Sequence, residues 1–383
     1  MSYQETTSRR ELMKAAGITA GVGGAVLTAG CTALLDDDDD DTGDDDPGEA
    51  VGDDTDPDDL PEEEMVWAFH GPPDPSLREG RIATTLKNYM ETKSDGRFTV
   101  DLRPGGEVGT VRESIEMIQD NTIQGGQLTG AHMAPFFPGF NVYAVPFLFD
   151  DVDLAMAVMD GPFGDKLKEA FREDTGQRVI TTLDVGGFQT ISSNIGPLDN
   201  MDVLEGQDIR TMEMEAHLEF YSQLGMNPEP MDIGELYEAL DTGLMDAQAN
   251  PVETMILFSL HEVQQYKLTN GPIMSILWAN VNDDWYQDLH PTYQVWLDQA
   301  GREASIAGRR MTRWYRNNGH PFLRDQGLEL TEPDDAFIEE VQDRTLEPVK
   351  EEIRDVMDRP ELLDELLDVV EETRDDLGYD SLD

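Results

Sequence analysis

The chain of 383 residues contains only one cysteine, Cys31, so no disulfide can form within it. It also lacks a CxxC pair, an HExxH motif and a glycine-rich phosphate loop. The histidines are few and scattered, and no two of them have the spacing of metal ligands: His70, His132, His217, His261, His290 and His320. We therefore expect no metal, no cofactor and no enzymatic activity, although a pair of catalytic carboxylates would be invisible among so many acidic residues.

Positive charge is scarce. The chain has 27 Lys and Arg against 81 Asp and Glu, a net charge of −54, and only seven of the basic residues are lysines. Nucleic acid is an improbable partner, because phosphate binding needs a basic patch. Self-repulsion of this size opposes compact folding, whereas in molar salt the screening length falls to about 3 Å. The composition is typical of proteins from extreme halophiles.

No long apolar run is present either. Residues 15–30 (AAGITAGVGGAVLTAG) are uncharged but shorter than the roughly 20 residues of a membrane-spanning helix. They follow Arg9 and Arg10, and this order predicts a secretory signal over residues 1–31. The arginine pair resembles the twin-arginine export signal, and T-A-G-C resembles a bacterial lipobox with Thr28 where leucine is usual. Cys31 is then the lipid attachment point. The alternative is a cytosolic apolar helix with a chance cysteine.

Residues 32–64 hold 18 Asp or Glu and no Lys or Arg. Such a segment cannot bury enough apolar surface to fold, and it repels itself. We expect a disordered tether between membrane and folded part, with a reach on the order of 100 Å. A metal-binding acidic tract is the alternative.

The remaining residues, from 65 onward, exceed one comfortable core and suggest two lobes. Apolar periodicity predicts helices at 76–93, 110–120, 151–159, 162–174, 214–224, 234–243, 291–317, 334–357 and 360–377. Strands are expected at 65–70, 98–102, 179–185, 188–194, 207–212, 245–250 and 275–282, and residues 124–133 form a short strand into a loop. This alternation predicts an α/β fold with largely parallel sheets, whose ligands bind at strand ends or between lobes.

One block is specific. Residues 206–210 read GQDIR, and residues 228–251 read PEPMDIGELYEALDTGLMDAQANP. Together with LRPGGEVG and VPFLFDD upstream, this pattern resembles the substrate-binding subunit of tripartite ATP-independent periplasmic (TRAP) transporters, over roughly residues 65–310. The resemblance implies a two-lobed, type II periplasmic-binding-protein-like fold with a cleft between the lobes and long C-terminal helices. It also implies capture of a small organic acid and its delivery to TRAP membrane permease subunits.

Lobe I is expected at 65–187 plus 276–315, and lobe II at 188–275 plus 316–383. Closure is expected to bend strands near 185–190 and 272–278, and the C-terminal helices are expected to brace both lobes. The predicted location is extracytoplasmic, at the cell surface and lipid-anchored to the cytoplasmic membrane.

The resemblance also assigns site residues. Arg210, in the family's I-R motif, is expected to grip the ligand carboxylate through two parallel N–H bonds; the alternative is an arginine paired with surface acids. Asn250 is expected to hydrogen-bond the ligand, or to cap a helix before Pro251. Gln189 stands where the family often has a second arginine, and Ile233 replaces an aromatic residue.

One positive anchor favours a monocarboxylate over a dicarboxylate. His70 and His132, in loops after strands of the first lobe, are further candidates for the cleft wall. Three other functions stay open at this point: a receptor of an ATP-driven transporter that binds a neutral solute, a secreted enzyme with paired carboxylates, and an acidic surface protein without a ligand.

Overall fold

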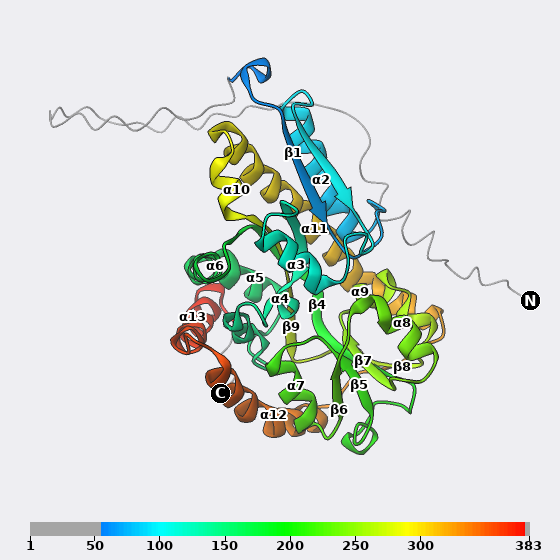
Figure 1. The fold of residues 1–383 in the computed structure, drawn as a ribbon. Coiled ribbons are helices and arrows are strands. Elements are labelled where there is room, and N and C mark those ends of the chain that lie inside the picture. Colours follow the sequence, from blue (N-terminus) through cyan, green and yellow to red (C-terminus); the bar gives the residue numbers. More distant parts are fainter. Residues whose placement is uncertain (1–54, 380–383) are drawn as a thin grey trace, which may run out of the picture.

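The computed structural model describes residues 55–379. The predicted signal, Cys31 and most of the predicted tether lie outside the described residues. Two groups of strands and helices occupy opposite ends of the molecule, with β4 and β9 between them (Figure 1). Among residues 55–379, no helix has both the length and the apolar character needed to cross a membrane.

The strands are β1 (Glu63–Ala68), β2 (Phe98–Arg103), β3 (Gly125–Thr129), β4 (Gln177–Ser193), β5 (Asp208–Thr211), β6 (Asn227–Pro230), β7 (Ala247–Asn250), β8 (Tyr266–Leu268), β9 (Ile273–Asn282) and β10 (Glu329–Thr331). The helices are α2 (Arg78–Lys93), α3 (Val111–Gln119), α4 (Gly130–Met133), α5 (Val152–Asp160), α6 (Pro162–Thr175), α7 (Glu215–Gln223), α8 (Ile233–Asp241), α9 (Val252–Leu257), α10 (Asp283–Asp288), α11 (Pro291–Asp325), α12 (Asp335–Val356) and α13 (Glu361–Leu377). Short 3-10 turns lie at Pro57–Asp59, Pro138–Ala144, Met201–Val203 and Leu260–Glu262.

The predicted helices agree with the structure to within a few residues apart from α11, and three short helices, α4, α9 and α10, were not predicted. Residues 130–133, expected in a loop, form α4. The last residues of α11 continue through Pro321 to Asp325. The helix continues past Pro321 because Phe322 and Leu323 are buried in the core, and this tertiary packing outweighs the backbone hydrogen bond that proline cannot form.

The sheet is mixed, which corrects the expectation of largely parallel sheets. Its strand order is β2-β1-β3-β9-β4-β7-β5-β6, with β8 beside β4 and β10 beside β8. Within the first group, β1 runs parallel to β2 and β3; within the second, β5 runs parallel to β6 and β7. The long strands β4 and β9 pair antiparallel with each other and join the two groups. The first lobe is therefore built on β2-β1-β3, and the second lobe on β7-β5-β6.

The two lobes are connected through a break in the β4–β9 ladder. The register shifts between Asp184 and Phe188. Gly186 and Gly187 occupy this gap with φ values of 91° and 103°, a backbone region that glycine adopts without the steric penalty of a Cβ. The interruption lies within the stretch 185–190 where bending was predicted.

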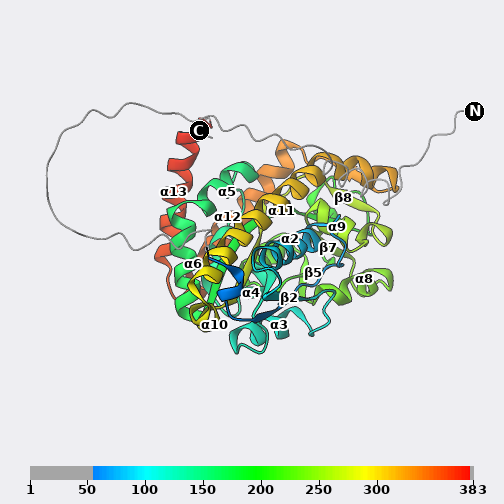
Figure 2. The ribbon, with the colours of Figure 1, turned by 90° about the horizontal axis from the view of Figure 1, so that it is seen from above.

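The C-terminal helices contact both ends of the molecule. Helix α11 packs on α2, β4 and α9, and in the view from above it runs from the α10 side toward α9 and β8 (Figure 2). Helix α12 packs on α7 of the second lobe, whereas α13 packs on α5 and α6. Because α5 and α6 belong to the range expected for lobe I, the assignment of all of 316–383 to lobe II does not describe α13.

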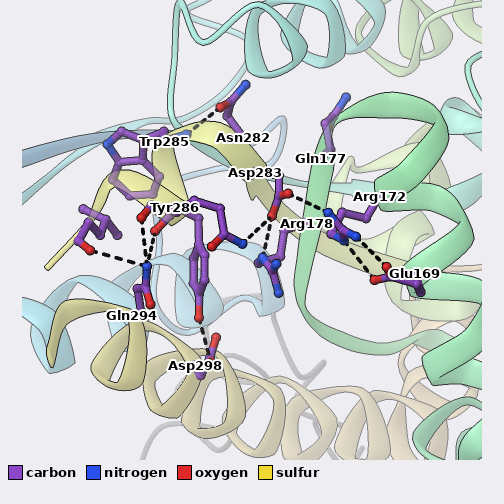
Figure 3. Close-up of polar contacts among 12 residues, drawn as sticks. Glu169, Arg172, Gln177, Arg178, Asn282, Asp283, Trp285, Tyr286, Gln294 and Asp298 are labelled. Atoms are coloured by element: carbon purple, nitrogen blue, oxygen red, sulfur yellow. Dashed lines mark hydrogen bonds and ion pairs between the residues drawn. The ribbon is translucent and has the colours of Figure 1, made fainter. Parts of the chain in front are cut away.

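A cluster of charged side chains fastens α10 to its neighbours (Figure 3). The carboxylate of Asp283 accepts from Arg172 Nη1 at 2.9 Å and from Arg178 Nε at 2.7 Å. The Arg178 guanidinium also lies 4.5 Å from the centre of the Tyr286 ring, a cation–π distance. Burial opposes ionisation of Asp283, but the hydrogen bonds from the two arginines bring its pKa below the usual value. The cluster thus joins α6, β4 and α10.

The folded part begins earlier than expected. The tether was predicted to end at residue 64, but β1 starts at Glu63 and Leu60 is only 3% exposed. Arg97 Nη2 donates to the carbonyl of Asp58 at 2.9 Å, and Tyr293 Oη donates to the carbonyl of Pro61 at 2.7 Å. These contacts order an acidic segment whose composition alone favours disorder.

Candidate functional site

Five of the six residues expected to contact a ligand line one cavity of about 50 Å³ between the lobes: His70, His132, Arg210, Ile233 and Asn250. His70 follows β1, and His132 lies on α4 directly after β3. On the second lobe, Arg210 is in β5, Ile233 begins α8, and Asn250 ends β7. The cavity therefore lies at the carboxyl ends of the parallel strands of both lobes, where α/β folds place their ligands.

Arg210 is 1% exposed. Its Nε and Nη2 donate to the carbonyl of Met231 at 2.8 and 2.6 Å, which fixes the plane of the guanidinium. It forms no ion pair with any carboxylate of residues 55–379, so the alternative of an arginine paired with surface acids is wrong. Burial lowers the pKa of Arg210 to about 10, and the group stays a cation at neutral pH. The charge of Asp232 offsets this burial only in part and makes no ion pair with Arg210, so a ligand carboxylate would add a directly bonded counter-charge.

Asn250 takes part in a polar network beneath the cavity. Its Nδ2 donates to Gln248 Oε1 at 2.6 Å, and its Oδ1 meets no donor in the described part of the chain. Helix α9 has Pro251 as its N-cap, with no side-chain capping bond, so the capping alternative is not what the structure contains. The hydroxyl of Thr254, which also lines the cavity, is buried without a hydrogen-bond partner. Both oxygens are free to bind a ligand hydroxyl.

The two histidines bring polar atoms but no charge. Nε2 of His70 contacts Ser114 Oγ at 3.1 Å, and Nδ1 of His132 contacts Thr129 Oγ1. Burial lowers the pKa of His70. Burial, followed by the positive charge of Arg210, lowers the pKa of His132 to about 3. Both imidazoles are neutral at pH 7, and Nε2 of His132 is buried without a partner.

The structure separates Gln189 from the other five. Gln189 lines a different cavity, of about 360 Å³, where its Oε1 accepts from Tyr221 Oη at 3.4 Å. Side chains alternate between the two faces of a strand. The side chain of the next residue of β4, Thr190, therefore lies on the opposite face from Gln189, where it contacts Lys267. The ligand contact expected of Gln189 therefore has no geometric support in this arrangement.

Sequence reasoning missed a second buried arginine. Arg78, the first residue of α2, is 1% exposed and lines the cavity from the first lobe. Its Nη2 lies 3.4 Å from Glu79 Oε1 and its Nε lies 3.6 Å from Glu253 Oε1. The sequence around it, LREGR, gives no signal of burial, because arginine and glutamate at a helix start usually belong to the surface.

Glu253 is the partner of Arg78 from the second lobe. It is 1% exposed, and neither of its carboxyl oxygens has a hydrogen-bond partner among the described residues. Burial raises the pKa of Glu253 to about 7, although the charge of Arg78 acts in the opposite direction. The carboxyl is therefore only partly ionised at neutral pH and offsets Arg78 incompletely.

A buried lysine supports the cavity floor. Lys267 is 0% exposed, and its Nζ donates to the carbonyls of Asn250 at 3.0 Å and Thr190 at 3.2 Å and to the hydroxyl of Thr190. Burial lowers the pKa of Lys267 to about 7. The lysine thus holds β7 and β4 together directly behind Asn250.

Asp232 connects the two lobes beside the cavity, in a small pocket that it shares with Val111 and His132. It caps α8 by accepting from Gly234 N at 2.9 Å, and it accepts from Val111 N, at the start of α3, at 3.1 Å. Burial opposes its ionisation, but these two hydrogen bonds lower the pKa of Asp232 below its usual range. Nearby, Arg112 Nη1 lies 3.0 Å from Glu213 Oε2, an exposed ion pair that also joins the lobes.

The site has the features of a binding cleft. Within residues 55–379, no group of three or more His, Cys, Asp or Glu side chains is placed to hold a metal ion. What the cavity offers is one buried cation without an ion-pair partner among the described residues, a second cation with acidic neighbours, and several hydrogen-bonding atoms without partners. These groups suit the capture of a polar anion.

Two curated periplasmic binding proteins are similar to this chain in sequence. The 2,3-diketo-L-gulonate-binding periplasmic protein YiaO of Escherichia coli is 25% identical over 248 residues, which is 65% of this chain and 75% of YiaO. The sialic acid-binding periplasmic protein SiaP of Vibrio cholerae is 24% identical over 265 residues, 69% of this chain and 82% of SiaP.

Solved structures share the fold. The sugar acid binding protein DctPAm of Advenella mimigardefordensis, in complex with galactonate, superimposes with a TM-score of 0.77 at 22% identity, covering 82% of this chain and all of that protein. A TRAP periplasmic solute binding protein from Polaromonas, bound to D-erythronate, gives a TM-score of 0.73 at 24% identity, covering 81% and 98%. Residues 73–355 match the family described as bacterial extracellular solute-binding protein, family 7 (DctP), and the chain therefore belongs to this family of TRAP solute-binding proteins.

Proposed function

We propose that this protein captures a small hydroxylated monocarboxylate, of the sugar-acid class, and delivers it to TRAP membrane permease subunits. The observation that carries the proposal is Arg210, a buried guanidinium that is held in place by the Met231 carbonyl and has no carboxylate partner among the described residues. A ligand carboxylate at this position would form charge-assisted hydrogen bonds in a site of low dielectric.

The balance of charge supports a single carboxylate. Arg78 is the other cation of the cavity, and Glu79 and Glu253 already lie 3.4 and 3.6 Å from it. A second ligand carboxylate near Arg78 would meet these acidic groups. Ligand hydroxyls, in contrast, can accept from Arg78 Nη1, which is buried without a partner, and can donate to Asn250 Oδ1 or Thr254 Oγ1. Relatives and neighbours with galactonate, D-erythronate or 2,3-diketo-L-gulonate in their names fit this class.

Binding is proposed to need a movement of the lobes. The cavity of about 50 Å³ is too small for a sugar acid. The register break at Gly186 and Gly187 supplies a place where β4 can bend, and the contacts of Asp232 and Arg112 are the ones that separation would break. In this proposal the lobes comprise 65–187 plus 276–315 and 188–275 plus 316–360, while α13 remains on α5 and α6.

The N-terminal region is proposed to place the receptor outside the cell. Residues 1–31 act as a twin-arginine signal, Cys31 carries the lipid, and the acidic residues up to about 56 act as the tether. Mass spectrometry of the purified N-terminus tests the lipid, with Cys31→Ser as the unmodified control. The charge of −54 fits a high-salt habitat; a melting temperature that does not rise with KCl would contradict this part.

The decisive experiment compares D-galactonate with galactitol, which has the same carbon skeleton and no carboxylate. In molar KCl, a ligand at about 100 times its Kd should stabilise the fold by roughly 2.7 kcal/mol. We expect galactonate to raise the melting temperature of the parent and not of Arg210→Ala. Arg344→Ala is the matched control, because Arg344 is exposed on α12 and, among the described residues, has Glu340 as its ion-pair partner. Equal responses to galactitol, or a full response of Arg210→Ala, would show that the carboxylate anchor is assigned wrongly.

A further inference from the structure

The larger cavity of the second lobe is unlike the site between the lobes. It measures about 360 Å³ and lies between β4, α7, α12 and the loop before β9. Its wall is mostly apolar and aromatic, with Ile191, Phe220, Leu224, Phe337 and Val341 all buried. No Lys, Arg or His of the described part of the chain lines it. The volume and the lining are those of a small-molecule pocket, for which about 300–1,000 Å³ is typical.

Within residues 55–379, Gln189 is the buried residue of the cavity wall that carries a side-chain amide. Gln189 is 4% exposed; its Oε1 accepts from Tyr221 Oη at the long distance of 3.4 Å, and its Nε2 has no acceptor within residues 55–379. This nitrogen is not among the fully buried unpaired polar atoms of the described residues, so it is open to the cavity and can be reached by water. A ligand acceptor would satisfy it.

Tyr221 and Gln189 separate this cavity from Arg210. Burial raises the pKa of the Tyr221 hydroxyl, and the positive charge of Arg210 acts against that rise, so the phenol lies within electrostatic range of the anchor. Of these two cavities, Arg210 nevertheless lines the one between the lobes and not the larger one, whereas Tyr221 lines the larger one and not the other. A molecule in the larger cavity would therefore not reach the proposed carboxylate anchor.

One wall of the cavity is held in a strained conformation. Phe147 has φ 60°, a region that residues with a Cβ rarely adopt. Its N–H donates to the carbonyl of Pro272 at 2.9 Å, and both residues line the cavity. Such strain persists only where the surrounding contacts impose it. The 146–149 segment is thus pinned to the loop before β9 and keeps this wall in place.

We propose that this cavity is a second binding site, which takes an uncharged ring compound with one hydrogen-bond acceptor for Gln189 Nε2. The compound must be uncharged because no cationic side chain lines the cavity and because Asp150, at its edge, is already paired with Arg374 at 2.7 Å. A ring fits because flat aromatic walls favour offset or edge contacts with another ring. The proposal does not depend on sugar-acid binding.

The test uses 1-indanone and indane, which share a fused-ring skeleton and differ in one carbonyl acceptor. Binding to the full mature protein is followed by ligand-observed NMR titration. Ile338→Trp fills the mouth of the cavity, and Ile306→Trp, at a residue 46% exposed on α11, is the matched control. Gln189→Leu removes the donor at similar size.

We expect saturable binding of both probes, with affinity reduced at least about tenfold in Ile338→Trp, a change of about 1.4 kcal/mol, and unchanged in Ile306→Trp. Gln189→Leu should weaken 1-indanone about threefold to tenfold and leave indane unaffected. Leu224→Phe, which narrows the cavity from its buried wall, serves as a second blocking variant if Ile338→Trp does not fold.

Several outcomes would overturn the proposal. These are no saturable binding of either probe, equal affinity in Ile338→Trp and Ile306→Trp, or displacement of 1-indanone by D-galactonate, which would make the two cavities one site. Failure of galactonate to bind would leave this result untouched, because Arg210→Ala is expected to bind 1-indanone like the parent.

Discussion

Replacing Val111 by proline removes one backbone N–H from the contact between the lobes and changes little else. Val111 is the first residue of α3, where the N–H has no partner within the helix. Its donor is used instead by Asp232 of the second lobe, at 3.1 Å. Proline is well tolerated at this helix position, and the preceding Thr110 has φ −65° and ψ 169°, which are the angles a residue before proline prefers.

The size of the effect follows from the geometry. A hydrogen bond to a charged group contributes about 1.5–3 kcal/mol. Asp232 is only half-buried, so we reduce the estimate to about 1–1.5 kcal/mol. Because the bond exists only when the lobes meet, its loss should weaken ligand binding by about fivefold to tenfold. Stability should change by less than about 1 kcal/mol, since proline also restricts the unfolded chain.

The assay is calorimetric titration with D-galactonate, together with denaturant unfolding of the ligand-free protein, at pH 7 and molar KCl. The pKa of Asp232 lies below its usual range, so the carboxylate is ionised under these conditions. Val111→Ala is the control, because it alters the buried side chain more and keeps the N–H. If Val111→Pro binds as tightly as Val111→Ala, the contact with Asp232 does not contribute to closure and the reasoning fails.

Three further perturbations test the scaffold. Asp283→Ala should lower the free energy of unfolding by about 2–3 kcal/mol at pH 7, because two arginines lose their shared partner. The pKa of Asp283 is depressed, so its contribution is present at neutral pH and is lost as pH falls below the usual 3.8, and the stabilities of parent and variant should converge in acid. As a control, Glu169→Gln, which removes an exposed partner of Arg172, should cost under about 1 kcal/mol. Lys267 has a pKa of about 7 in the fold against the ordinary 10.5, so the unfolded chain binds more protons between these values and stability should rise with pH across that window. Unfolding of Lys267→Met at pH 7 and about 9.5 should lack this rise, and an identical slope in both proteins would contradict the assignment. Gly271→Ala places a Cβ 1.8 Å from the carbonyl oxygen of Gln189, and calorimetry should show a stability loss of about 2–3 kcal/mol; an unchanged melting temperature would mean that the loop moves freely.

The pattern of residues along the chain was sufficient to predict most of the longer helices and to find Arg210, the proposed carboxylate anchor. Arg210 and Asn250 could be found because they belong to a contiguous block of sequence with a specific pattern. Strand β6 could not, since its sequence NPEP contains two prolines. Within residues 55–379 it pairs with β5 alone, and such an edge strand tolerates prolines that a central strand would not.

The two site residues that sequence reasoning misjudged, Gln189 and Arg78, depend on contacts between distant segments of the chain. Gln189 was placed by its position in the motif, yet the face of β4 to which it points depends on the register break between Asp184 and Phe188. Arg78 looked like a surface residue, yet its burial depends on Glu253, which is distant in sequence and lies on the other lobe. Neither the register nor this pairing is encoded within a short window.

By itself, the sequence determined the acidic character, the expected export signal, the order of the longer helices and strands, and the motif that carries Arg210, since each of these is a property of composition or of near neighbours along the chain. The tertiary structure alone decided that the sheet is mixed, that a second arginine enters the cavity, that Asp232 joins two helix starts, and that Gln189 belongs to a separate apolar cavity. These features arise from burial and pairing between distant segments. Burial, in turn, is what shifts the pKa values of Glu253 and Lys267, because removal from water disfavours the charged form of each.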